Sequence, residues 1–315
     1  MGTPEFAVAT LDAILNAGHE VVCVVTTPDK PAGRGQQMHC SDVKRYALEH
    51  QLPILQPEKL KDDSFVEDLR DYRPDVFVVV AFRMLPRCVY AMPMLGTFNV
   101  HASLLPQYRG AAPIQRAIMN GERETGVTAF LIDEKLDEGR MLCSVTVPVA
   151  PDETGGELHD ALLDAAAPLM FDTLRKIEEG SFVPVPQPLN DGTLPTAPKI
   201  FREDCRIRWN RPVEQIYNQI RALSPYPGAF TTVRKQGGGE AVLVKIFKAV
   251  MSHDSCGLPA GTVTTDNRHT LSVAAPDGCL RVEELQLFGK RRMSGSDFLA
   301  GNKGCDGAVC LEEEA

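Results

Sequence analysis

Several common signatures are missing from this sequence of 315 residues. Its nine cysteines form no CxxC pair, and no Cys/His pair has the spacing of a zinc finger. The sequence therefore offers neither a disulfide framework nor a structural zinc site. No apolar run approaches the roughly 20 residues of a membrane-spanning helix. We expect reduced thiols in a cytoplasmic protein that has no contact with a membrane.

Two enzyme signatures are missing as well. No GxGxxG follows the position of a first strand, which argues against a nucleotide-binding dehydrogenase. No GxSxG frames a serine, so the sequence has no nucleophile elbow of the α/β-hydrolase type.

Positive charge is scarce overall, and the net charge of −9 argues against a generic nucleic-acid binder. The part after Cys205 holds 14 Lys/Arg and 12 Asp/Glu, a balance of +2, and this permits a phosphate-rich partner there.

The first half of the chain alternates short apolar runs with amphipathic stretches. Thr3 and Pro4 form a good start for a helix to Asn16, with Gly18 past its end. This alternation predicts an α/β fold with a Rossmann-like, mostly parallel sheet and helices on both faces. The predicted buried strands are 20–25, 75–80, 97–101, 127–132 and 141–147, and the predicted further helices are 41–50, 62–71 and 154–179.

The composition changes after residue 182. The stretch VPVPQP at 183–188 is typical of an extended linker. After it, a helix at 212–223 precedes short strand-like runs, which predict a compact OB-like β-barrel. These runs are 229–233, 242–250, 262–263, 270–274 and 280–287. We therefore predict an N-terminal domain 1–182, a linker 183–204 and a C-terminal domain 205–315.

The stretch FNVHASLLPQYRGAAPIQ at 98–115 holds the most informative pair of side chains. Asn99 and His101 lie two apart on a predicted strand, so both point to the same face. They lie at the carboxyl end of that strand, where open α/β sheets bind ligands. An amide NH₂ and an imidazole N–H directed at one point can stabilise a developing oxyanion. No protein nucleophile accompanies them, so the attacking group would belong to the substrate.

A carboxylate is needed to orient His101 and to balance its charge. Asp137, in LDEGRML at 136–142, is the best candidate, because it lies in a loop between two predicted strands beside Gly139. Asp133 and Glu134 remain alternatives that sequence spacing does not separate.

These motifs resemble the signature of the 10-formyltetrahydrofolate-dependent formyltransferase family. FNVHASLLPQYRGAAPIQRAI resembles that family's N-x-H motif and the loop after it, and ETGVT and LDEGRML resemble the two blocks that follow. MGTPEFA, TTPDKPAGRGQ and RALSPYPGAF extend the resemblance over essentially the whole chain. The resemblance implies formyl transfer from 10-formyltetrahydrofolate to the α-amine of methionine esterified to initiator tRNA. A small amine, such as glycinamide ribonucleotide or an amino sugar, is the alternative acceptor. An RNA-binding module is the non-enzymatic alternative.

The resemblance also implies roles for particular residues, with no metal and no stable protein partner. Asn99 and His101 would stabilise the oxyanion, and Asp137 would position His101. The folate pocket would be lined by Ser103, Leu104, Leu105 and Pro106, together with Phe82, Arg83, Met84 and Leu85. Contacts to tRNA would come from Lys30, Arg34, Lys245, Lys248, Lys290, Arg291 and Arg292.

One departure from the family pattern concerns the start of the chain. Relatives carry an apolar strand before their GTP-E/D-F motif, and here Met1 occupies the position where that strand would end. Such a first strand is central in a doubly wound sheet. We expect that the functional chain begins upstream, and that without this strand the neighbouring strands lack a partner.

Overall fold

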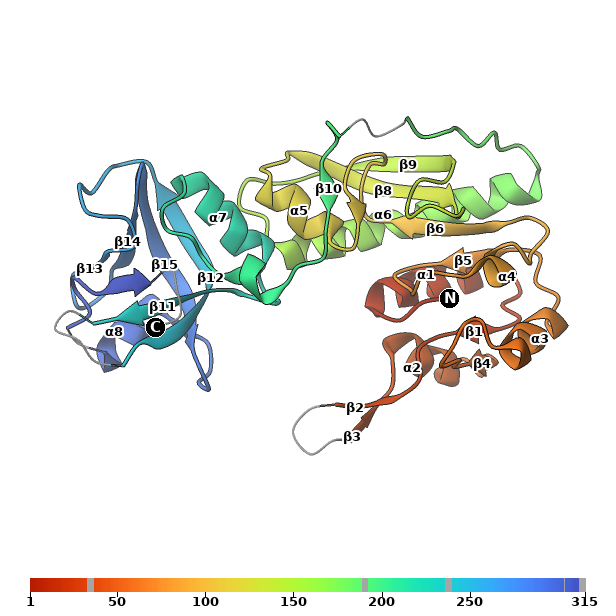
Figure 1. Ribbon diagram of the computed structural model, residues 1–315, viewed down its shortest axis with the longest axis horizontal. Helices are drawn as coiled ribbons and strands as arrows, with labels where there is room; N and C mark the ends of the chain where they lie inside the picture. The colour runs from red at the N-terminus through yellow and green to blue at the C-terminus, as the bar shows by residue number, and fades with distance from the viewer. Residues whose placement is uncertain (33–36, 189–191, 236–239, 303, 312–315) are drawn as a thin grey trace. The chain divides into compact units, whose positions relative to one another are not determined.

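A computed structural model describes residues 1–32, 37–188, 192–235, 240–302 and 304–311. The chain divides into two compact units (Figure 1). The N-terminal unit comprises 1–110, 124–148 and 160–197, and the C-terminal unit comprises 111–123, 149–159 and 198–315.

The N-terminal unit is a mixed α/β structure. Its helices are α1 (Glu5–Asn16), α2 (Asp42–Glu49), α3 (Asp63–Asp71), α4 (Arg87–Tyr90) and most of α6 (Gly155–Glu178). Its strands are β1 (Val24–Val25), β2 (Lys30–Ala32), β3 (Gln37–His39), β4 (Ile54–Leu55), β5 (Phe77–Val79), β6 (Thr97–His101), β7 (Arg109–Gly110), β8 (Glu124–Leu131), β9 (Met141–Pro148) and β10 (Thr196–Ala197). The four predicted helices of this half are confirmed to within one or two residues.

The four-stranded sheet of this unit is mixed rather than mostly parallel. Its order is β5-β6-β8-β9; β5 and β6 are parallel, whereas β8 is antiparallel to both of its neighbours. A loop of nine residues joins β8 to β9, so this connection is a hairpin and forces an antiparallel pair. Figure 1 shows β6, β8 and β9 side by side with α6 along them.

Met1 and Gly2 lie between two parts of the sheet structure. Gly2 N–H donates to the Val25 carbonyl at 3.1 Å, and the Met1 carbonyl accepts from Val80 N–H at 2.9 Å. The parallel pair β1-β4 lies on one side of these residues and β5 on the other. A cavity of about 320 Å³ opens beside them, and residues 20–25 and 72–78 contribute to its lining. The predicted strand 20–25 is therefore confirmed only at β1, because only its last residues have hydrogen-bonded neighbours.

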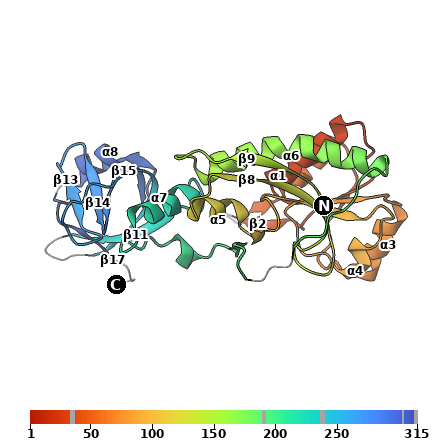
Figure 2. The ribbon, with the colours of Figure 1, turned by 90° about the horizontal axis from the view of Figure 1, so that it is seen from above.

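The C-terminal unit contains a nearly closed antiparallel β-barrel (Figure 2). Its helices are α5 (Pro113–Met119), the 3₁₀ helix η1 (Arg202–Cys205), α7 (Val213–Ala222) and α8 (Gly295–Gly301). Its strands are β11 (Ala229–Arg234), β12 (Val242–Ser252), β13 (Val263–Thr265), β14 (Leu271–Ala275), β15 (Gly278–Leu287), β16 (Met293–Ser294) and β17 (Val309–Leu311).

Closure of this barrel comes from its two edges. The strand order is β13-β14-β15-β12-β11-β17, and the bridge Thr262–Val309 joins the two ends of that order. Val263 N–H donates to the Ala308 carbonyl at 2.8 Å, and Cys310 N–H to the Gly261 carbonyl at 2.8 Å. A cluster of buried side chains that includes Trp209 fills the interior. The predicted barrel strands are confirmed, with bounds that differ by a few residues.

Among the described helices, none has the length and apolar character needed to cross a bilayer.

Candidate active site

The strand β6 carries Asn99 and His101 between two neighbours. Asn99 is opposite Val79 of β5 and Phe130 of β8, and His101 is opposite Thr128 of β8. Because side chains alternate along a strand, the two residues share one face of the sheet. His101 is 7% exposed, so its ring lies inside the protein at the end of the strand. This is the arrangement that the sequence predicts for the pair.

His101 is fixed by the backbone of the following loop. Its Nε2 lies 2.8 Å from the carbonyl oxygen of Tyr108. A carbonyl only accepts, so Nε2 carries a proton and donates. The ring also makes an edge-to-face contact with Phe130 at a centroid distance of 6.5 Å. One N–H of the imidazole is thus directed at the backbone of the protein.

The loop after β6 is fixed by one side chain of β8 and by one side chain of its own. Thr128 Oγ1 donates to the Ser103 carbonyl at 2.7 Å and accepts from Leu105 N–H at 3.2 Å. Ser103 Oγ donates to the Gln107 carbonyl at 2.7 Å. These bonds occupy the Ser103 hydroxyl within its own turn, which agrees with the lack of a nucleophile motif around it.

The side-chain amide of Asn99 has an unpaired hydrogen-bond acceptor. Its Oδ1 is buried and has no hydrogen-bond partner among the described residues. Leaving a buried polar atom unpaired costs about 1–3 kcal/mol. A buried polar atom without a partner needs an explanation, and a catalytic role is one that suits its position on the same strand face as His101. Rotation of the amide by half a turn would place its NH₂ group at the same position.

Asp137 reaches this region from the loop between β8 and β9. Its Oδ2 accepts from Gly110 N–H at 3.0 Å. In the described part of the chain Asp137 and His101 are linked indirectly, because His101 binds Tyr108 and Asp137 binds Gly110. The structure therefore ties both side chains to one segment of three residues.

The two alternative carboxylates face other partners. Asp133 is exposed and accepts from Lys135 N–H at 2.8 Å. Glu134 is exposed and lies 3.3 Å from Arg87. Neither of these contacts leads to His101, and this supports the choice of Asp137.

The residues expected around a folate fall into two groups. The group at 103–106 follows β6, and the group at 82–85 follows β5, so both lie at the carboxyl edge of neighbouring parallel strands. Leu85 and Leu105 are buried, whereas Met84 is 71% exposed. Arg83 is engaged with the backbone: it donates to the carbonyls of Pro57 and Glu58 at 2.8 and 2.9 Å.

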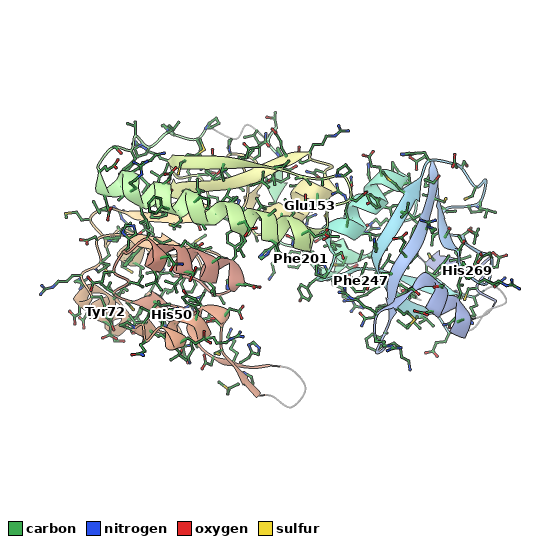
Figure 3. All side chains as sticks on the ribbon, turned by 180° about the vertical axis from the view of Figure 1, so that it is seen from behind. His50, Tyr72, Glu153, Phe201, Phe247 and His269 are labelled. Carbon is green, nitrogen blue, oxygen red and sulfur yellow. The ribbon has the colours of Figure 1, made fainter. Side chains whose placement is uncertain are left out.

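Several of the expected tRNA contacts already have partners within the protein. Lys245 Nζ donates to the Pro227 carbonyl at 2.7 Å, and Lys248 lies 3.5 Å from Glu283. Arg292 donates to the Pro225 carbonyl at 2.8 Å and lies 3.6 Å from the centroid of the Phe247 ring, which is labelled in Figure 3.

Lys290 and Arg291 are exposed in the turn between β15 and β16, and Lys30 is exposed on β2. Arg34 lies outside the described residues. In the part of the chain that the structure describes, no group of three or more His, Cys, Asp or Glu residues has the arrangement of a metal site.

Two family models match the chain. Residues 1–174 match the model described as "Formyl transferase", and residues 199–303 match "Formyl transferase, C-terminal domain". The first match contains Asn99, His101 and Asp137, and the second contains most of the barrel.

Individual proteins of known sequence or structure are also similar to this chain. The protein named methionyl-tRNA formyltransferase from Bacteroides thetaiotaomicron is 48% identical over 311 residues, which are 98% of this chain and 96% of that protein. An N-formyltransferase from Helicobacter canadensis, solved with folinic acid and dTDP-3-aminofucose, has a TM-score of 0.63 at 19% identity and covers 89% of this chain and 96% of that chain. HypX from Aquifex aeolicus, solved with tetrahydrofolic acid, has a TM-score of 0.57 at 21% identity, and the match covers 80% of this chain but only 43% of HypX. At these identities the two structures show a shared fold.

Proposed function

The chain belongs to the formyl transferase family, and we propose that it acts on methionyl initiator tRNA. It would transfer the formyl group of 10-formyltetrahydrofolate to the α-amine of the esterified methionine, giving N-formylmethionyl-tRNA for translation initiation. The observation that carries this proposal is the 48% identity to a methionyl-tRNA formyltransferase over 98% of the chain. The likeness to the N-formyltransferase solved with dTDP-3-aminofucose is a likeness of fold at 19% identity, so it gives less support to the small-amine alternative.

The proposed chemistry needs no protein nucleophile. The substrate amine attacks the formyl carbon and forms the new C–N bond, which places negative charge on the formyl oxygen. The tetrahedral intermediate then collapses, the bond to N10 breaks, and a proton from the amine passes to N10. Asn99 and His101 would donate hydrogen bonds to the oxyanion, where a preorganised donor has its greatest effect.

Asp137 would support the charged form of His101. An imidazolium has an N–H on each ring nitrogen, so one can remain on the Tyr108 carbonyl while the other faces the oxyanion. The carboxylate of Asp137, held at Gly110, would balance this charge and assist the proton transfer, directly or through water.

The two substrates would contact different segments of the chain. The folate would lie against the residues at 82–85 and 103–106, because an apolar wall suits a flat pteridine ring. The tRNA would contact the loop 29–38 and the barrel.

We also propose the domain division 1–182, 183–204 and 205–315, a cytoplasmic location, and an OB-like barrel. In the N-terminal domain we propose a single Rossmann-like sheet with helices on both faces, and the hydrogen bonds of Met1 and Gly2 to both of its parts support it.

The test is a formyl-transfer assay with 10-formyltetrahydrofolate and charged initiator tRNA, run beside glycinamide ribonucleotide and an amino-sugar nucleotide. We expect product with the charged tRNA. Activity only with a small amine would overturn the proposed acceptor.

His101→Ala tests the proposed chemistry in the same assay. We expect kcat to fall by about 10² or more, as it does when an oxyanion donor is lost. The exposed His253→Ala is the matched control and should retain the wild-type rate. A His101→Ala enzyme with a near-normal kcat would remove His101 from the mechanism.

A further inference from the structure

We propose that Gln187 and Arg109 are positioning residues that hold Asp137 in place for the reaction. This inference rests on the proposed formyl transfer, and it assigns a role in the active site to a segment whose sequence predicts only a linker. The relevant contacts all lie within the N-terminal unit.

The loop that carries Asp137 requires support from outside itself. Asp137 has φ of 54°, a left-handed conformation that is uncommon for residues other than glycine, although aspartate tolerates it better than most. Two positions further on, a Cβ added to Gly139 would lie 1.6 Å from the Leu131 carbonyl oxygen, so the loop is pressed against the end of β8. A strained backbone of this kind persists only where surrounding groups fix it.

The amide of Gln187 supplies that fixation. Its Nε2 donates to the carbonyl of Asp137 at 2.9 Å and to the carbonyl of Gly139 at 2.7 Å. Both N–H groups of the amide are therefore used on the two carbonyls of the strained loop. The contact reaches across 50 residues of sequence to Asp137.

Arg109 orients the other end of the same amide. The Gln187 Oε1 accepts from Arg109 Nε at 3.0 Å and from Nη2 at 2.7 Å. The Arg109 side chain is only 10% exposed, and it also lies 3.8 Å from Glu138. Bonds to a charged, largely buried guanidinium are stronger than bonds between neutral groups, so this pair fixes the rotamer of Gln187.

The backbone of Arg109 is itself fixed. Its strand β7 pairs in parallel with β10, and Tyr108 N–H donates to the Pro195 carbonyl at 2.7 Å. Gly110, which donates to the Asp137 carboxylate, lies so close to this pairing that a Cβ would be 2.4 Å from the Ala197 carbonyl oxygen.

The contacts form a closed ring. Gln187 holds the backbone of Asp137, Gly110 holds its carboxylate, and Arg109 joins the two. Tyr108, next to Arg109, also holds His101, so loss of the Gln187 contacts would release Asp137 relative to His101.

The decisive variant is Gln187→Glu. A carboxylate keeps an acceptor for Arg109 but has no N–H to donate, and it would repel the carbonyls of Asp137 and Gly139. We expect kcat to fall roughly 10- to 100-fold, the size of effect that small displacements of catalytic groups produce. The KM values for tRNA and for the folate should change by less than about twofold, since neither substrate is proposed to touch Gln187.

Gln219→Glu provides a matched control. The Nε2 of Gln219 bridges the carbonyls of Asp204 and Arg206 at 2.8 and 2.9 Å in the C-terminal unit, so the substitution makes the same chemical change away from Asp137. We expect it to lower the melting temperature but to leave kcat near the wild-type value. A fall in kcat of equal size in both variants would overturn the proposal.

A double-mutant cycle separates positioning from a general structural effect. If Gln187 acts through Asp137, then Gln187→Glu should cost less than about twofold in an Asp137→Ala background. Full additivity of the two losses, or a wild-type kcat for Gln187→Glu alone, would contradict the proposal. If instead the proposed function is wrong, the wild-type protein itself will not formylate methionyl-tRNA. The double-mutant cycle would then be run with the amine that the protein does accept.

Discussion

Asn99 shows how activity and stability can conflict in a single side chain. Its Oδ1 is buried and unpaired among the described residues, so the amide carries an energetic cost in the folded protein. Asn99→Leu replaces the amide with an apolar group of similar size. We expect it to lower kcat by about 10²-fold, because a proposed oxyanion donor is lost. We also expect it to raise the free energy of unfolding by about 1 kcal/mol.

Steady-state kinetics and urea denaturation measure the two effects separately. A variant that loses stability while its kcat stays unchanged would show that the amide serves the fold rather than the reaction. The wild-type residue would then be a structural side chain at a strand end.

The sequence identifies those site residues whose relation follows from local spacing along the chain. The spacing of Asn99 and His101 on one strand predicts their shared face, and Gly139 marks the loop of Asp137. Gln187 was missed, because a Pro-rich stretch predicts an extended spacer and its partner Arg109 lies 78 residues away. A glutamine within that stretch gives no local signal of such a contact.

The barrel strands depend on a polar bond inside an apolar core. Trp209 Nε1 donates to Thr231 Oγ1 of β11 at 3.0 Å, and both side chains are about 1% exposed. Thr231→Val keeps the shape but leaves the indole N–H without its acceptor. We expect a loss of about 1–3 kcal/mol in the free energy of unfolding.

Urea denaturation followed by tryptophan fluorescence measures this loss directly, since Trp209 is the only tryptophan in the chain. Thr232→Val on the same strand is the control, because the next side chain points to the other face. Equal stabilities of the two variants would contradict a role for the buried bond.

The stability of the same barrel should depend on pH through Asp266, which lies in the turn between β13 and β14. Hydrogen bonds from the backbone N–H groups of Thr270, Arg268 and His269 hold the pKa of Asp266 well below its usual range. The folded pKa is thus below the unfolded value of about 3.9. The charged carboxylate stabilises the fold above that value, and this contribution is lost as the pH falls through the folded pKa.

Asp266→Asn keeps an acceptor but removes the charge. We expect a lower melting temperature than wild type at pH 7 and a difference that shrinks as the pH falls below about 3.9. Melting curves from pH 7 to pH 2 test this. A difference that stays constant over the whole range would exclude the carboxylate as its cause.

Elements with strong periodicity could be predicted from the sequence, and very short ones could not. Strand β6 and the helices α1, α2 and α3 agree with their predicted ranges. The two-residue strands β7 and β10 form only because segments far apart in the sequence meet, so no local pattern reveals them. The mixed direction of the main sheet also went unpredicted, because apolar runs in parallel and antiparallel central strands look alike.

The charge of the whole molecule bears on how an acidic protein could bind tRNA. The chain has a net charge of −9, so binding must depend on local basic groups rather than on the overall field. Lys245 and Arg292 donate to backbone carbonyls, and Lys248 pairs with Glu283. Lys290 and Arg291, both exposed in the turn after β15, are the better candidates for contacts with phosphates.

Salt dependence tests this assignment. Each phosphate contact contributes about 0.9 to the slope of log affinity against log salt concentration. We expect the double variant Lys290→Ala/Arg291→Ala to reduce that slope by about 2 for charged initiator tRNA and to weaken binding at low salt. Lys61→Ala, which removes another exposed lysine, should leave the slope unchanged. If the slope of the double variant equals that of wild type, the tRNA backbone does not contact this turn, and the exposed Lys30 on β2 becomes the next candidate.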